Sequence, residues 1–236
     1  MTTHEANIGL VLDCADPVAL AEFWSAALGY VNLGSAGNYV ALFPDGRPGP
    51  KLLLQHVAEP KTTKNRMHLD IEVADIEAEA SRLEALGARR VQPAQLHEHG
   101  TTWILMADPE GNELCVIEPG NSFLDGCGFL GELACDGSRD VGLFWSAATG
   151  WPLVWDQDEE TAIQSPRGGT KVAWGGPPLT PRTGRSRQRL RLTAAGGDLG
   201  AEADRLVALG ATRLTDSEGG IALADPDGNE FFVTGG

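Results

Sequence analysis

Three ionisable side chains alternate along one short segment of this 236-residue sequence. His68, Asp70 and Glu72 are separated from one another by single apolar residues. Successive side chains of a β-strand point to opposite faces, so the three polar groups are expected to share one face. That face is expected to be wet, because three ionisable groups are not buried unpaired. Two interpretations stay open: a solvated face on which His68 bonds to Asp70, or a site of ligand contact and proton transfer.

Four more side chains on predicted strands are candidates for ligand contact. Cys115 is more typical of a small buried core residue than of a nucleophile. Trp103 offers a large, flat apolar surface, and Gln55 is a weak oxygen donor. Arg191 is expected on the same face as Arg189, either paired with acids on a solvated surface or binding a planar oxyanion through its guanidinium.

The segments that must position these residues occur twice. Residues 23–30 (FWSAALGY) return as residues 144–151 (FWSAATGW), and residues 107–113 (ADPEGNE) return as residues 224–230 (ADPDGNE). A nearly constant offset of about 120 residues predicts two homologous domains. We place them at residues 1–120 and 129–236, with a linker over residues 121–128.

Each half is predicted to contain two βαβββ modules. In the first module an alternating strand ends at Cys14, Asp16 and Pro17 begin a helix, and Gly29 ends it. The apolar residues of that helix recur at the spacing of one face, so the helix is expected to cover a sheet. The fold class is therefore α+β, with helices covering one face of each sheet.

Composition narrows the functional classes. The 33 acidic residues outnumber the 18 basic ones, the net charge is −15, and both halves are acidic, which argues against nucleic-acid binding. No apolar segment approaches the roughly 18 residues of a membrane helix, and no export signal is visible, so a cytoplasmic protein is expected. Its four cysteines are expected to be reduced thiols.

The paired modules, the Phe-Trp helix that ends in Leu-Gly, and the Asp-Pro-x-Gly-Asn turn resemble the vicinal oxygen chelate superfamily, in its glyoxalase-like and bleomycin-resistance branch. The resemblance implies that the two modules of each domain form a cup-shaped mixed sheet with helices outside. It also implies that the two domains pack like the subunits of a single-domain dimer, which gives a pseudo-dimeric monomer or a homodimer.

Metal enzymes of that superfamily hold an ion with His, Gln or Glu on four facing strands. The corresponding positions are Gly9, Gln55, His68 and Cys115 in the first half and Leu130, Gly175, Arg191 and Phe232 in the second. The second set cannot hold a cation, and the first offers one strong ligand, His68. We therefore expect no complete metal site; a divalent ion at His68 and Gln55 is the alternative.

Two hypotheses follow from the resemblance. The first is a protein that binds a small apolar or aromatic metabolite or antibiotic in a cup, without a complete metal site. Its expected ligand contacts are Gln55, His68, Asp70, Trp103, Cys115 and Arg191. The alternative is a divalent-metal-dependent enzyme of the glyoxalase or dioxygenase type, active in the first domain only. A metal-free enzyme that uses His68 or Glu113 as acid or base lies between them.

Overall fold

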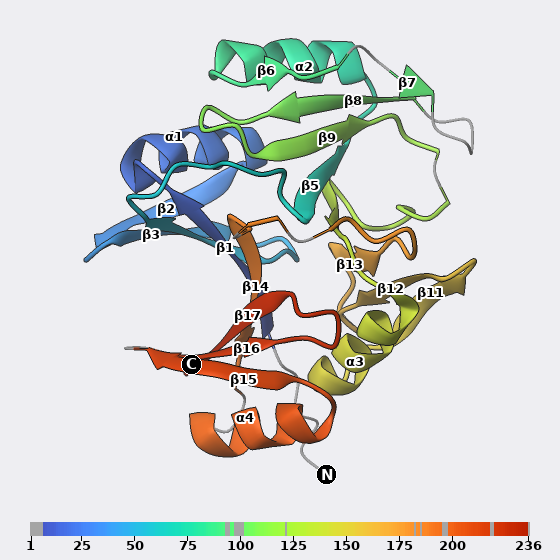
Figure 1. Cartoon of the computed structure of the whole chain (residues 1–236). Helices are drawn as coiled ribbons and strands as arrows, with labels where there is room; N and C mark the ends of the chain where they lie inside the picture. Colours follow the sequence, from blue (N-terminus) through green and yellow to red (C-terminus); the bar gives the residue numbers. More distant parts are fainter. Residues whose placement is uncertain are drawn as a thin grey trace.

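A computed structural model of the chain describes residues 7–92, 95–96, 102–120, 122–181, 183–184, 186–194, 198–217 and 220–235. The chain folds into four consecutive modules (Figure 1). Module 1 contains β1 (Asn7–Cys14), α1 (Pro17–Leu28), β2 (Tyr30–Ala36), β3 (Tyr39–Pro44) and β4 (Lys51–His56). Module 2 contains β5 (Met67–Glu72), α2 (Ile76–Ala85), β6 (Arg89–Arg90), β7 (Gln95–Leu96), β8 (Thr102–Ala107) and β9 (Glu113–Ile117).

The second half repeats this order. Module 3 contains β10 (Leu130–Cys135), α3 (Arg139–Thr149), β11 (Leu153–Gln157), β12 (Glu160–Gln164) and β13 (Lys171–Trp174). Module 4 contains β14 (Gln188–Thr193), α4 (Leu199–Ala208), β15 (Thr212–Ser217), β16 (Gly220–Ala224) and β17 (Glu230–Thr234). None of the helices in the described part of the chain has the length and apolar character needed to span a membrane.

The modules join into two mixed sheets. The first sheet has the order β15-β16-β17-β14-β1-β4-β3-β2, and the second has the order β11-β12-β13-β10-β5-β9-β8-β6, with β7 paired to β8. The α+β class and the helix-covered sheets are confirmed. Sheet composition differs from the expectation that each half forms its own sheet: module 1 pairs with module 4, and module 2 with module 3.

The reason lies in the strand edges. The strand that begins each module along the chain lies at one end of that module's four strands in the sheet. Its outer backbone groups therefore need a partner strand from another module. Strand alternation is equally compatible with a partner from either half. In the folded chain β1 pairs antiparallel with β14, and β5 pairs antiparallel with β10, so each sheet contains strands from both halves.

The repeated sequence motifs are structural. Asp16 caps α1 by accepting hydrogen bonds from the backbone of Val18 and Ala19, and Gly29 ends it at a φ of 66°. Trp24 is fully buried, and its Nε1 donates to Asp108 Oδ2 at 3.1 Å. The Phe-Trp motif and the Asp-Pro turn of the first half therefore contact each other.

The segment predicted as a linker packs into the molecule; Asn121 lies outside the described residues. Phe123, Leu124 and Cys127 are buried. The Phe123 ring meets Trp155 edge-on at 5.2 Å, and Lys171 Nζ donates to the Phe123 carbonyl. We call the sheet face opposite the helices the inner face; this segment covers part of the inner face of the second sheet.

Candidate functional site

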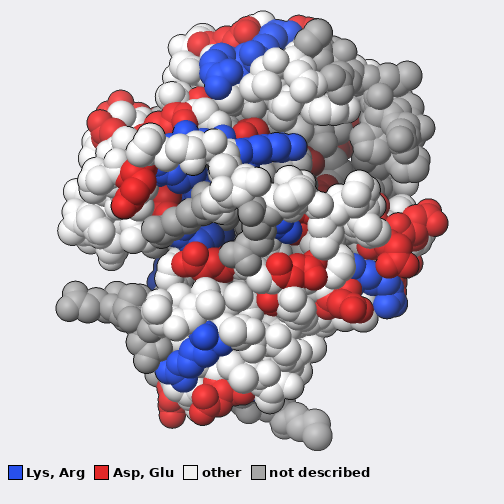
Figure 2. Space-filling model, in the orientation of Figure 1, with Lys and Arg blue, Asp and Glu red and all other residues white. Residues whose placement is uncertain are grey.

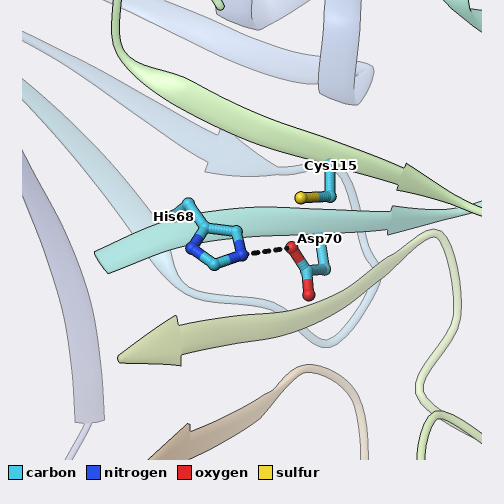
Figure 3. Close-up of side chains that lie close together, drawn as sticks. All are labelled: His68, Asp70 and Cys115. Carbon is cyan, nitrogen blue, oxygen red and sulfur yellow. Dashed lines mark ion pairs between the residues drawn. The ribbon is translucent and has the colours of Figure 1, made fainter. Parts of the chain in front are cut away.

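β5 places His68 and Asp70 together on the inner face of the second sheet. Met67, Leu69 and Ile71 point into the core, as the alternation predicted. His68 Nε2 lies 3.2 Å from Asp70 Oδ1 (Figure 3). The His68 side chain keeps 31% of its surface exposed, whereas Asp70 keeps 10%, so the imidazole is the more accessible member of the pair.

Cys115 joins this pair from the neighbouring strand. β9 runs parallel to β5 and places Cys115 directly beside Asp70. One ligand atom from each of His68, Asp70 and Cys115 lies within 4.8 Å of the others, as Figure 3 illustrates. The expectation of a buried thiol is compatible with the structure, but this thiol faces two ionisable groups rather than the apolar core.

The second half supplies two further groups that the sequence analysis missed. Glu132 on β10 lies opposite Asp70, and Lys171 on β13 lies opposite Glu132. Cys115, Asp70, Glu132 and Lys171 thus form a line across four adjacent strands, which we call the acidic row. Glu132 is only 8% exposed. A carboxyl group buried beside another carboxyl group marks a place where cation binding would be favourable.

Glu132 was missed because the repeat aligns Leu130 with Gly9. The pairing of β10 with β5 shifts between Leu130 and Glu132, and this irregularity turns Leu130 into the core. A usable signal was present: Glu132 is the single charged residue of the segment Leu130–Cys135. A lone acid within an apolar strand is a buried polar group that needs an explanation.

Burial and neighbouring charge determine the protonation of the acidic row. Burial, followed by the charge of Asp70, raises the pKa of the Glu132 carboxyl well above its usual value. Burial also raises the pKa of the Cys115 thiol, again helped by Asp70. For His68 burial acts to lower the pKa, but Asp70 and Glu132 outweigh it and the pKa is raised. Without a bound cation, the thiol is therefore neutral near pH 7 and the imidazole holds its proton more tightly.

The remaining predicted contacts divide between the two sheets. Trp103 is half-buried on β8 in the second sheet, on the inner face by alternation with the core residue Ile104. Gln55 is on β4 and Arg191 is on β14, both in the first sheet. The alternative of an ion at His68 and Gln55 would join residues of two different sheets, whereas the donor atoms that the structure brings together are those of His68, Asp70 and Cys115.

The first sheet has a different inner face. Arg189 donates from both Nη atoms to Asp13, at 2.7 and 2.6 Å, and both side chains are 1% exposed. Arg191 Nε donates to Thr234 Oγ1 at 2.9 Å. Two arginines on the inner face confirm the predicted alternation of β14. On the side of the molecule seen in Figure 2, acidic side chains lie beside most of the basic ones, in keeping with the net charge of −15.

Comparison with known proteins agrees with this architecture. The sequence model described as "Glyoxalase-like domain" matches residues 9–117 and again residues 132–234. The chain belongs to the glyoxalase-like family. Both halves of this glyoxalase-like chain match, including the second half, which has no metal-binding side chain at the four aligned positions. A search of curated proteins found no match to the sequence.

Solved structures with the same fold include glyoxalase I. The enzyme from Zea mays has a TM-score of 0.68 and 14% identity, over 98% of this chain and 93% of that chain. Its V278E mutant gives a TM-score of 0.67, with 14% identity over 98% and 93%. A glyoxalase/bleomycin resistance protein/dioxygenase family enzyme from Burkholderia phytofirmans PsJN matches 46% of this chain and 94% of its own, at 16% identity and a TM-score of 0.38. At 14% identity the likeness to glyoxalase I concerns the fold alone.

Proposed function

We propose that this glyoxalase-like chain binds one divalent transition-metal ion at the acidic row and uses it on a small organic molecule. The observation that carries the proposal is the convergence of the His68, Asp70 and Cys115 donor atoms within 4.8 Å. Glu132 lies opposite Asp70 and can complete the set from the other half of the chain. The working site would then need both halves, rather than the first domain only.

The donor set fits some ions and not others. An imidazole nitrogen, a thiolate sulfur and carboxylate oxygens suit Zn²⁺ and other ions of intermediate softness. Mg²⁺ and Ca²⁺ prefer oxygen ligands alone. The raised pKa values of Glu132 and Cys115 mean that a divalent cation would have to displace a proton from each group, so metal binding should strengthen as the pH rises.

Each residue of the site has a distinct part in this proposal. A bound ion would polarise an oxygen atom of the ligand or of a water molecule. Asp70 Oδ1 lies 3.2 Å from His68 Nε2 and would orient the imidazole, which binds a metal ion in its neutral form. Lys171 binds the Phe123 carbonyl and helps to close one end of the row against water.

A second candidate is the binding of a small apolar or aromatic metabolite without a metal. It is favoured by the burial that keeps Cys115 and Glu132 in their neutral forms, which are poor ligands. Trp103 would then supply a flat apolar contact. Both candidates are compatible with a pseudo-dimeric monomer as the working unit, because one chain completes both sheets.

Metal titration tests the proposal. Protein treated with a chelator and dialysed should take up one equivalent of Co²⁺ and develop a thiolate-to-cobalt charge-transfer band. Cys115→Ser should abolish the band, and Asp70→Asn or Glu132→Gln should weaken binding at least about tenfold. Gln55→Ala, on the other sheet, is the control and should bind like the unchanged protein. Failure of the chain to bind Co²⁺ or Zn²⁺ above background would refute the metal proposal and leave metal-free binding.

A further inference from the structure

The two sheets carry different side chains at equivalent positions, although each has a lysine at one of them: Lys51 in the first sheet and Lys171 in the second. In the first sheet the register aligns residues across β17, β14, β1 and β4, and they are Phe232, Arg191, Gly9 and Lys51. We call this line the basic row. Its counterpart in the second sheet is the acidic row. Arg191 therefore stands where the second sheet has Asp70, and Gly9 stands where it has Glu132.

The guanidinium of Arg191 is held by a hydroxyl group. Its Nε is held by Thr234, and burial lowers the pKa of the guanidinium. Among the residues that the structure describes, no carboxylate forms an ion pair with Arg191. Arg189, two residues away on the same face, has both Nη atoms on the buried carboxylate of Asp13. A half-buried guanidinium without a carboxylate gains most from an external anion.

Gly9 places no side chain between two cationic residues, and a Cβ atom there would lie 3.9 Å from Lys51 Cβ. Arg191 and Lys51 are its direct neighbours on either side. Adjacent strands lie about 4.8 Å apart, so the two cationic residues start roughly 10 Å from each other across a position without a side chain. Lys51 is exposed, its Nζ lies 4.9 Å from the centroid of the Phe43 ring, and no ion pair involves it within the described residues. An anion above Gly9 is within reach of both cationic side chains.

Apolar side chains lie beside Arg191 and Lys51 on the inner face of the first sheet. Phe232 lies beside Arg191, Phe43 lies beneath Lys51, and Leu53 is the next inner-face residue along β4. All three are half-buried, unlike the fully buried residues that alternate with them on the helix-covered face. These surfaces can contact the body of a small molecule whose charged end lies between the cations.

We propose that the basic row is a second binding site, which takes a small organic carboxylate with an apolar or aromatic body and needs no metal. The carboxylate pairs with Arg191 in the bidentate manner of guanidinium and with Lys51 as a point charge. A chain of net charge −15 repels anions at long range. A carboxylate is therefore held only where cationic side chains such as Arg191 and Lys51 attract it at short range. The site goes beyond the proposed metal function and does not depend on it.

Calorimetry with chelator-treated protein tests the inference. The probes are benzoate, 3-phenylpropionate and indole-3-acetate, each compared with its neutral primary amide. At least one acid should bind with a stoichiometry of one, and its amide should bind at least about tenfold more weakly. Arg191→Gln should weaken binding of the acid by a similar factor and leave the amide unchanged. Lys51→Gln, at an exposed position that poses little risk to folding, should have a smaller effect in the same direction.

Arg139→Gln is the matched control, because it removes one positive charge from an exposed position on α3. It should leave the affinity for the acid unchanged. Three results would each overturn the inference: no saturable binding of any acid at millimolar concentration, equal binding of acid and amide, or equal losses in the Arg191 variant and the control. Failure of Co²⁺ binding would refute the metal proposal alone, since the calorimetry is done without metal.

Discussion

The ion pair between Asp13 and Arg189 permits a quantitative test of how the two halves are joined. It links β1 to β14 across 176 residues of sequence, and its N–O distances are 2.7 and 2.6 Å. Both side chains are 1% exposed. Removing one partner of a buried pair costs about 3–5 kcal/mol, because the other charge is left without compensation.

Asp13→Asn is the informative substitution, since it keeps the shape of the side chain and removes the charge. The guanidinium would keep its bond to the Ser186 carbonyl, at 3.2 Å, and its position 5.1 Å from the Phe232 ring. These remaining contacts place the expected loss of unfolding free energy near the lower end of the range, at about 3 kcal/mol. A loss of that size is a large share of the roughly 5–15 kcal/mol that stabilises a typical protein.

Urea unfolding at pH 7, followed by both tryptophan fluorescence and circular dichroism, measures this loss. The control is Asp156→Asn, which breaks a two-bond pair with Arg139 that is exposed on both sides. The control should leave the unfolding free energy unchanged within error. The reasoning would be refuted if Asp13→Asn cost less than about 1 kcal/mol, or if the control cost as much.

Two further predictions concern the acidic row and the segment beside it. The pKa of the Glu132 carboxyl is raised in the folded protein, so this group contributes fully to stability below its ordinary pKa of 4.5. The contribution is lost as the pH rises toward the folded-state pKa. The pKa of His68 is also raised, so His68 likewise reduces the stability as the pH rises above 6.5. A series of urea unfolding curves on metal-free protein should therefore show the unfolding free energy falling as the pH rises. Glu132→Gln should reduce the slope of the unfolding free energy against pH. An unfolding free energy that does not change with pH would contradict this account. Phe123→Ala should lower the unfolding free energy by about 3–5 kcal/mol, because the ring is 7% exposed. The exposed neighbour Ser122→Ala should change it little in the same unfolding assay, and equal effects would show that the segment is not packed.

Local features were predicted well from the sequence. The alternation of β5 and β14 and the cap and stop of α1 follow from interactions between residues close in sequence. Periodicity and capping report on such local interactions directly. The family resemblance, carried by two short repeated motifs, was confirmed over both halves.

The composition of the candidate site was predicted only in part. His68, Asp70 and Cys115 come together as their strands suggested, but Gln55 belongs to the other sheet. Glu132 was not placed by the constant offset of the repeat, because Phe144 follows Glu132 by 12 residues whereas Phe23 follows the equivalent Gly9 by 14. Lys171 was missed as well, because its place in the acidic row depends on its pairing with Glu132.

The sequence by itself determined the modules, the faces of β5 and β14 on which their side chains lie, and the family. Tertiary structure alone decided which modules share a sheet, and with them the composition of the acidic row and the basic row. The physical reason is that a strand edge carries the same backbone donors and acceptors whichever partner it meets. The partner of β1 or β5 is selected by packing of the whole chain, including the buried pair of Asp13 and Arg189 and the segment around Phe123.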